Sequence, residues 1–227
     1  MAKKKDNTEE RIVAVEEALS SSEQFIEKNQ KILTYIVGGV IVIILAFFGY
    51  NKYVMAPQEK AAEIAIFNAQ YYFDQDSLDL ALNGDGVNAG FLEIIDDFGS
   101  TKGGNLAKYY AGICYFNLGE YEDAIDYLKK FSAEDQVVSS MALGAIGDSY
   151  MQLGDASKAV DFYLKAARKN VNDFVTPTFL VKAGWTYEVM GNWQNALDTY
   201  ESIKKDFPKT KEAREIDKYI ARAKAQL

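Results

Sequence analysis

The stretch SSMALGAIGDSYMQLGDASKAVDFYLKAA, at residues 139–167, decides the fold of this chain, because its spacing of small and large residues occurs three times. The preceding copy is GNLAKYYAGICYFNLGEYEDAIDYLKKF at residues 104–131, and the following copy is PTFLVKAGWTYEVMGNWQNALDTYESI at residues 177–203. Equivalent residues of consecutive copies lie 35 and 37 positions apart. A unit of this length that recurs in one chain predicts a repeat architecture.

Five positions recur in the same order in every copy. A small residue is followed three positions later by tyrosine, then four later by glycine, five later by alanine and four later by a large residue. The glycine permits a tight turn between two helices, and the small residues let the helices approach closely. The recurring residues are Gly112, Tyr115, Gly119, Ala124 and Leu128; Gly147, Tyr150, Gly154, Ala159 and Tyr163; and Gly184, Tyr187, Gly191, Ala196 and Tyr200.

This pattern resembles the tetratricopeptide repeat, whose unit of about 34 residues is a pair of antiparallel helices. The resemblance implies an all-α fold in which the helical hairpins stack into a solenoid. Three unrelated amphipathic hairpins would not share five positions in one order. The units are expected at residues 105–138, 140–173 and 177–210.

The repeats are flanked by segments that match the pattern less well. Residues 57–104 are expected to form a degenerate first hairpin, because FLEIIDDFGSTK at 91–102 echoes YESIKKDFPKTK at 200–211. The polar and glycine-rich residues 76–90 are expected to be an enlarged loop of this hairpin. Residues 211–227 are expected to form a helix that caps the last repeat, since a solenoid needs a polar terminal cover.

Residues 32–51, ILTYIVGGVIVIILAFFGYN, form an uncharged run between Lys31 and Lys52. Twenty helical residues span roughly 30 Å, the thickness of the hydrocarbon core of a bilayer. The run is too long and too far from the start for a cleaved signal peptide, so we expect a permanent transmembrane helix. Six cations precede the run, whereas only Lys52 and Lys60 follow it closely, which predicts a cytoplasmic N-terminus.

Residues 1–31 are expected to form a cytoplasmic arm. Ser20 and Glu23 have the spacing of a capping box, which favours two short helices. The sequence leaves two roles open, a partner-binding amphipathic helix and a solvated segment before the membrane.

The charge of the chain lies almost entirely behind the transmembrane run. Residues 1–56 carry seven cations and seven anions, so the net charge of −8 belongs to residues 57–227. An acidic domain argues against nucleic-acid binding, because that function needs a cationic face. The last 24 residues are locally basic, which indicates either a solvated terminal helix or a second binding surface.

Candidate catalytic groups are few. The chain contains no histidine, which removes the commonest general base and zinc ligand, and we expect neither a metal nor a cofactor. The one cysteine, Cys114, lies in the apolar stretch AGICYF and is interpreted as a core residue. The glycines at 84 and 86 have the spacing of part of a dinucleotide loop, but no strand precedes them, so a turn is expected.

The resemblance to tetratricopeptide repeats implies that the first helix of each unit lines an inner groove. Its ligand-facing positions are here apolar and aromatic with two acids, and they lack the Lys, Asn and Arg with which some family members hold a C-terminal carboxylate. Methionine and aromatic side chains suit adaptable contact with hydrophobic segments. For Phe116 and Trp185, packing against the neighbouring helix or the capping segment is the alternative. The candidate binding residues are Tyr109, Ile113, Phe116, Asp148, Met151, Val181, Trp185 and Glu188.

The whole arrangement, a charged arm, one uncleaved span and an acidic repeat domain, resembles the YfgM-like family of bacterial inner-membrane proteins. That resemblance implies a single-pass protein of the inner membrane with its repeats in the periplasm. It also implies an accessory role beside the Sec translocon. The implied partners are translocon subunits, newly translocated or unfolded client proteins and periplasmic chaperones.

Two other classes of function stay open at the level of sequence. A structural adaptor for envelope assembly or cell division could use the same fold with one dedicated partner. An enzyme would need a pair of carboxylates for acid and base chemistry, and nothing in the spacing selects such a pair. The sequence gives neither the identity of the partner nor the oligomeric state.

Overall fold

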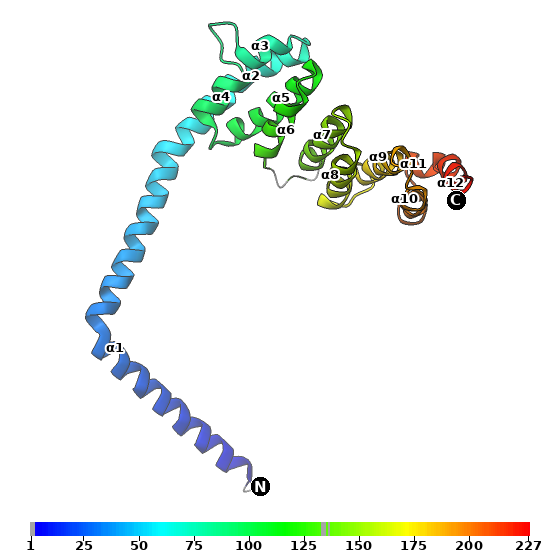
Figure 1. Cartoon of the computed structure of the whole chain (residues 1–227). Helices are drawn as coiled ribbons and strands as arrows, with labels where there is room; N and C mark the ends of the chain where they lie inside the picture. Colours follow the sequence, from blue (N-terminus) through cyan, green and yellow to red (C-terminus); the bar gives the residue numbers. More distant parts are fainter. Residues whose placement is uncertain (1–2, 133–134, 136) are drawn as a thin grey trace. The chain divides into compact units, whose positions relative to one another are not determined.

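The structure of the protein is a computed structural model that describes residues 3–132, 135 and 137–227, with side chains from Phe25 onward. The described residues form helices and no strand, which confirms the all-α prediction (Figure 1). The chain divides into two compact units, residues 1–57 and residues 58–227.

The first unit is built on one long helix, α1 (Lys3–Tyr50), which is followed by a π-helical turn, η1 (Asn51–Met55). The prediction of two short helices in the arm is therefore wrong. No glycine or proline interrupts residues 3–37, so nothing in the backbone ends the helix at the serine run. The side chains of Ser20 and Glu23, the proposed capping box, lie outside the described residues.

The apolar part of α1 has the properties of a membrane-spanning helix. Its side chains are not buried by protein, and Ile43 and Phe48 remain 69% and 65% exposed. The helix is long and apolar enough to cross a membrane. Such a surface is unfavourable in water and is stabilised by lipid, because the hydrophobic effect acts on every exposed face.

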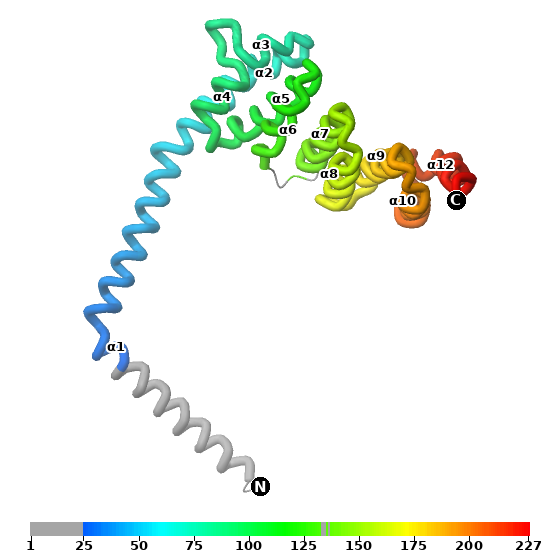
Figure 2. Tube along the Cα trace, viewed as in Figure 1, coloured from blue at the N-terminus to red at the C-terminus, as the bar shows by residue number. Residues whose placement is uncertain are grey.

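The second unit contains consecutive helical pairs, α5 with α6, α7 with α8 and α9 with α10, which follow one another along the chain (Figures 1 and 2). In this unit, α2, α3 and α4 precede the pairs, and α11 and α12 follow them. The helices are α2 (Ala56–Asp74), α3 (Leu78–Asn83), α4 (Phe91–Phe98), α5 (Lys102–Leu118), α6 (Tyr121–Lys130), α7 (Val138–Gln152), α8 (Ala156–Lys169), α9 (Thr176–Val189), α10 (Trp193–Asp206), α11 (Lys211–Glu215) and α12 (Asp217–Lys224).

One turn geometry joins the two helices of every pair. The glycine of each turn has a positive φ, between 71° and 84°, which only glycine adopts without strain. In the middle pair, the Gly154 amide donates to the Met151 carbonyl at 3.1 Å and the Asp155 amide donates to the Tyr150 carbonyl at 2.9 Å. Asp155 then caps α8 by accepting from the Lys158 amide at 3.0 Å. This Schellman-type turn reverses the chain and starts the next helix at once.

The recurring small residue allows the two helices of a pair to touch. A Cβ atom added to Gly147 would lie 2.7 Å from the Tyr163 ring, and one added to Gly184 would lie 2.2 Å from the Tyr200 ring. The recurring alanine faces the same contact, and Ala159 is fully buried. The sequence pattern therefore encodes a close helix crossing in which a large side chain lies over a glycine.

Neighbouring pairs pack through the same kind of contact. Phe179 of α9 lies over Gly144 of α7, where an added Cβ would approach its ring to 2.0 Å. At the start of the unit, α2 packs closely on α5, since a Cβ on Gly103 would lie 2.8 Å from the Ala62 side chain. The Glu59 carboxylate of α2 also accepts from the Lys102 amide at 2.9 Å, so α2 caps the first repeat helix.

The structure differs from the sequence prediction at both ends of the repeats. The expected loop at residues 76–90 contains α3, whose Ala81 and Leu82 are buried in the core shared with α5. That burial explains why a short helix forms among polar residues. The expected capping helix at 211–227 is two helices, α11 and α12, with the fully buried Ile216 between them.

The helix crossing gives a first prediction. We expect Ala159→Leu to destabilise a fragment of residues 57–227 by about 1–3 kcal/mol, because the added atoms have no space at the α7–α8 contact. For a domain of this size, each kcal/mol lowers the midpoint by about 2–4 °C in thermal denaturation. Ser157→Leu, at an exposed position of the same helix, is the matched control. Equal thermal midpoints for the two variants would contradict the close packing of α7 on α8 at Ala159.

Candidate protein-binding surface

The eight candidate residues lie on the first helix of each pair, but they differ in what they contact. Three lie on α5, two on α7 and three on α9. Their environments range from fully packed to clearly exposed. In chain order they are Tyr109, Ile113 and Phe116; Asp148 and Met151; and Val181, Trp185 and Glu188.

The α5 residues mainly pack inside the repeat stack. The Tyr109 ring lies 5.5 Å from the Phe131 ring, and burial together with neighbouring Tyr110 raises the pKa of its hydroxyl. Ile113 packs against the buried residues shared by α6 and α7. Phe116 is half-buried, with its ring 5.7 Å from that of Tyr121. This end of the predicted groove therefore offers little free apolar surface.

Asp148 is fully engaged by residues of two other helices. It accepts a hydrogen bond of 2.6 Å from the Tyr163 hydroxyl of α8. It also binds the Lys182 ammonium of α9 at 2.7 Å, in a pair whose side chains are 30% and 32% exposed. The carboxylate thus joins the second pair of helices to the third.

Glu188 repeats this arrangement one unit later. It accepts from the Tyr200 hydroxyl of α10 at 2.9 Å and binds the Arg222 guanidinium of α12 at 2.5 Å. The Glu188 side chain is 11% exposed and is better shielded from water than Asp148, whereas Arg222 is 49% exposed. The cation again lies 34 residues beyond the acid, as in the Asp148–Lys182 pair.

These two networks change the interpretation of the predicted groove. Both of its acids are compensated within the protein, so neither presents an unpaired negative charge to a ligand. Burial, followed by the hydrogen bond to Asp148, raises the pKa of the Tyr163 hydroxyl, and the same causes act on Tyr200 through Glu188. The tyrosines therefore remain neutral donors at physiological pH.

Cys114, the one cysteine of the chain, is a buried free thiol on α5. Burial raises the pKa of the Cys114 thiol to about 12, so it stays protonated and unreactive at neutral pH. Among the described residues, no group of three or more His, Cys, Asp or Glu side chains could hold a metal ion. Cys114 packs as a small core residue, in agreement with its apolar sequence context.

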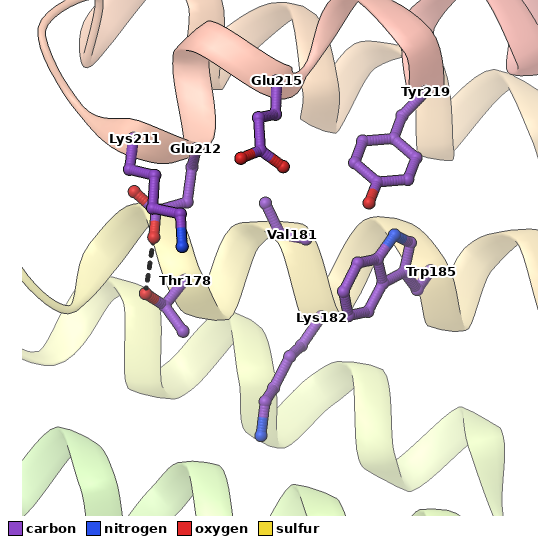
Figure 3. Close-up of a pocket in the computed structure, with 8 residues that line it drawn as sticks. All are labelled: Thr178, Val181, Lys182, Trp185, Lys211, Glu212, Glu215 and Tyr219. Carbon is purple, nitrogen blue, oxygen red and sulfur yellow. Dashed lines mark hydrogen bonds between the residues drawn. The ribbon is translucent and has the colours of Figure 1, made fainter.

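Three exposed apolar side chains, Met141, Phe174 and Trp185, line two neighbouring hollows. The first, of about 200 Å³, lies between α9 and the terminal helices α11 and α12 (Figure 3). Trp185 is 42% exposed there, and its ring stands edge-on to that of Tyr219 at 5.7 Å. At the other end, the Thr178 hydroxyl donates to the Glu212 carboxylate at 3.2 Å.

The second hollow, of about 480 Å³, continues from the first along the start of α9, because Thr178, Lys211 and Glu212 line both. Its apolar wall includes Met141 of α7 and Phe174, which are 44% and 75% exposed. We call the two hollows together the α9 surface. The first hollow alone follows α9 from Thr178 to Trp185, which corresponds to about 10 Å of helix.

The α9 surface contains two residues that sequence reasoning did not select as binding residues, Phe174 in the turn before α9 and Tyr219 in the terminal cap. Phe174 carried a usable signal, since this large aromatic residue follows the polar residues Asn172 and Asp173 in a turn between two units. The terminal segment was expected to cover the last repeat, and the structure places Tyr219 of α12 against Trp185.

Comparison with known protein families identifies the type of repeat in this chain. Two family models described as tetratricopeptide repeat match this chain, one at residues 106–135 and 179–210 and the other at residues 142–168. No curated protein sequence shows a significant match. The chain therefore contains tetratricopeptide repeats, as its spacing predicts, and such repeats form scaffolds for protein interaction.

Solved structures share the fold at low sequence identity. A crystal structure of the MamA protein is 19% identical, with a TM-score of 0.54, over 73% of this chain and 91% of that one. A putative kinesin light chain with nearly identical TPR-like repeats, from Podosopora anserina, is 12% identical, with a TM-score of 0.57, over 74% of this chain and 87% of that one. Identities this low establish the solenoid fold alone.

The acid–tyrosine networks give a pH-dependent prediction. We expect Tyr163→Phe to destabilise the protein by about 1–2 kcal/mol at pH 7, because Asp148 loses a donor. The folded-state pKa of Tyr163 is raised above its ordinary value of 10.0, so its contribution is complete below pH 10 and is lost as pH rises further.

The difference in unfolding free energy between wild type and Tyr163→Phe should therefore be constant up to about pH 9 and shrink as pH rises through about 10 to 11. Urea denaturation at a series of pH values measures this difference. The matched control is Tyr71→Phe, at a tyrosine that is 57% exposed. A difference that stays constant across this pH range would show that the hydroxyl is not buried in the folded protein.

Proposed function

We propose that this protein is a membrane-anchored scaffold whose α9 surface binds apolar segments of other proteins. The observation that carries the proposal is the exposure of Met141, Phe174 and Trp185 around one pair of neighbouring hollows in the repeat domain. Large apolar side chains that remain in water on a rigid surface favour contact with a partner, because burial of that area is favourable.

The charges near the α9 surface support an apolar partner. Lys182 is neutralised by Asp148, and Glu215 is neutralised by Lys218 at 3.2 Å. Glu212 is held by the Thr178 hydroxyl. Lys211, Glu212 and Asp173 also line the hollows, and their mixed signs leave no strong excess of one charge to attract a strongly charged ligand. Binding through this surface should therefore depend weakly on salt.

We further propose that the chain is an accessory factor of the Sec translocon in a bacterial inner membrane. In this proposal, residues 1–31 are the cytoplasmic arm, residues 32–51 cross the membrane, and the repeats lie in the periplasm. Newly translocated proteins are unfolded and expose apolar segments, which is the chemistry that the α9 surface suits. Translocon subunits and periplasmic chaperones would be its other partners, and the architectural resemblance to YfgM-like proteins supports this placement.

The orientation can be tested by protease protection. Because six cations precede the apolar run and two follow it closely, protease added to spheroplasts should digest residues 103–227. Immunoblotting with an antibody against the repeat domain measures the loss, and a cytoplasmic protein in the same sample reports intact membranes. Protection of the repeats until the membrane is broken would reverse the orientation.

Binding can be tested with an unfolded model client and the full-length protein in detergent. We expect Trp185→Ala to weaken binding by about 2 kcal/mol if this tryptophan anchors the client. Phe116→Ala should change affinity less, because that side chain lies on α5, away from both hollows. Val189→Ala, at a residue of α9 that is 70% exposed and lines neither hollow, is the matched control.

Circular dichroism must show that each variant keeps its helix content. Equal affinities for wild type and Trp185→Ala would exclude the α9 surface as the client site. Crosslinking in cells from position 185 then separates the two classes of scaffold. Capture of many nascent chains supports a translocation factor, whereas capture of one constant neighbour indicates a dedicated structural adaptor.

A further inference from the structure

The terminal cap differs in charge from the rest of the repeat domain. Residues 57–203 carry ten Lys and Arg against 22 Asp and Glu, whereas residues 204–227 carry eight against four. Four of these eight cations form ion pairs, namely Lys204, Lys218, Arg222 and Lys224. The other four are exposed and have no ion-pair partner among the residues that the structure describes, namely Lys205, Lys209, Lys211 and Arg214. We call these four residues the cap row.

The cap row begins inside the α9 surface and continues beyond it. Lys211 lines both hollows, and Figure 3 shows it beside Thr178 and Glu212. Lys205 lies in the last turn of α10, Lys209 in the turn that leads to α11, and Arg214 on α11 itself. All four cations belong to one segment of ten residues. A bound chain that leaves the hollows toward the cap therefore meets several unpaired cations.

Few acids oppose the cap row. Asp206 and Glu212 lie in the same segment, and the Glu212 carboxylate accepts from the Thr178 hydroxyl. Glu215, which follows Arg214, is paired with Lys218 at 3.2 Å. The hollows themselves carry charges of both signs, but the segment beside them keeps an excess of positive charge.

We propose that the preferred clients of the α9 surface are apolar segments that continue into acidic residues. The apolar side chains occupy the hollows, and the carboxylates of the flank lie on the cap row. This inference rests on the proposed function, because the apolar segment brings the flank to the row. Exposed ion pairs are individually weak and are screened by salt, so the cap row adds selectivity while the hollows supply most of the attraction.

The cap row also discriminates between clients of opposite charge. An acidic flank meets opposite charge at this edge of the α9 surface, whereas a basic flank meets like charge and is disfavoured. The preference is local, since exposed charges separated by more than about 8 Å are largely screened at physiological salt. The acidic repeats further along the domain therefore do not cancel it.

An anionic lipid surface is the other partner that a row of cations fits. Two observations favour a client segment. Lys211 lines the hollows in which the apolar segment is proposed to lie, so the row is continuous with that site. The domain before the cap carries 22 acids against ten cations, and this excess opposes the approach of an anionic bilayer.

Three synthetic peptides test the inference with the full-length protein in nanodiscs of a zwitterionic lipid. They share one apolar core of leucine and phenylalanine, followed by a short run of glutamate, glutamine or lysine. A second set carries the run before the core, which covers the other direction of the client along α9. Fluorescence anisotropy at low salt should show that the glutamate peptide binds on the order of tenfold more tightly than the glutamine peptide. The lysine peptide should bind more weakly than either, and the differences should fall below about two-fold near 0.5 M salt.

Charge reversal tests where the flank binds. Lys209→Glu combined with Arg214→Glu should remove the preference for the glutamate peptide, because both cations lie in the cap row and line neither hollow. The glutamine peptide reports separately on the hollows, and circular dichroism reports on the fold. The matched control is Lys60→Glu combined with Lys130→Glu, at exposed lysines of α2 and α6, which makes the same change in net charge and should keep the preference.

The outcomes separate this inference from the proposed function. If none of the peptides binds, the proposed function fails and the inference fails with it. If the glutamine peptide binds but the glutamate peptide gains nothing, or the lysine peptide binds more tightly, the hollows bind clients and the acidic flank is wrong. The preference should persist in nanodiscs that contain phosphatidylglycerol. Its loss there would show that anionic headgroups occupy the cap row, and would overturn the acidic client.

Discussion

The close approach of two helices in each repeat is the contact on which the rest of the domain depends. A glycine on the first helix lies beneath a large side chain of the second, as Gly184 does beneath Tyr200. A Cβ atom at this glycine would overlap the ring, so the crossing exists only because the small residue leaves space. The positive-φ glycine at the end of the first helix then reverses the chain in a short turn, which keeps the second helix close to the first.

The same contact brings a tyrosine hydroxyl to each of the two acids Asp148 and Glu188. Tyr163 and Tyr200 pack over their glycines, and their hydroxyls reach Asp148 and Glu188 on the first helix of their own pair. Each acid also binds a cation that the next helix along the stack provides. A hydroxyl that stays neutral can donate to a carboxylate in a half-buried place, where a second acid could not. The packing inside one repeat is therefore coupled to the junction with the next.

Compensation of Asp148 and Glu188 leaves apolar side chains as the main feature of the α9 surface. Met141, Phe174 and Trp185 are exposed around its hollows. Hollows with mixed side chains suit an adaptable contact with varied segments.

The sequence by itself determined the repeats, their turns and the apolar length of α1, because glycine geometry, helix period and hydrophobic length are properties of residues near one another in the chain. It also placed Trp185 and Met151 on the correct helices. Only the tertiary structure showed that Asp148 and Glu188 are paired, since their cations lie 34 residues away. The tertiary structure likewise formed α3 by burying Leu82 and completed the α9 surface with Tyr219, because burial and enclosure depend on contacts between elements that no local pattern records.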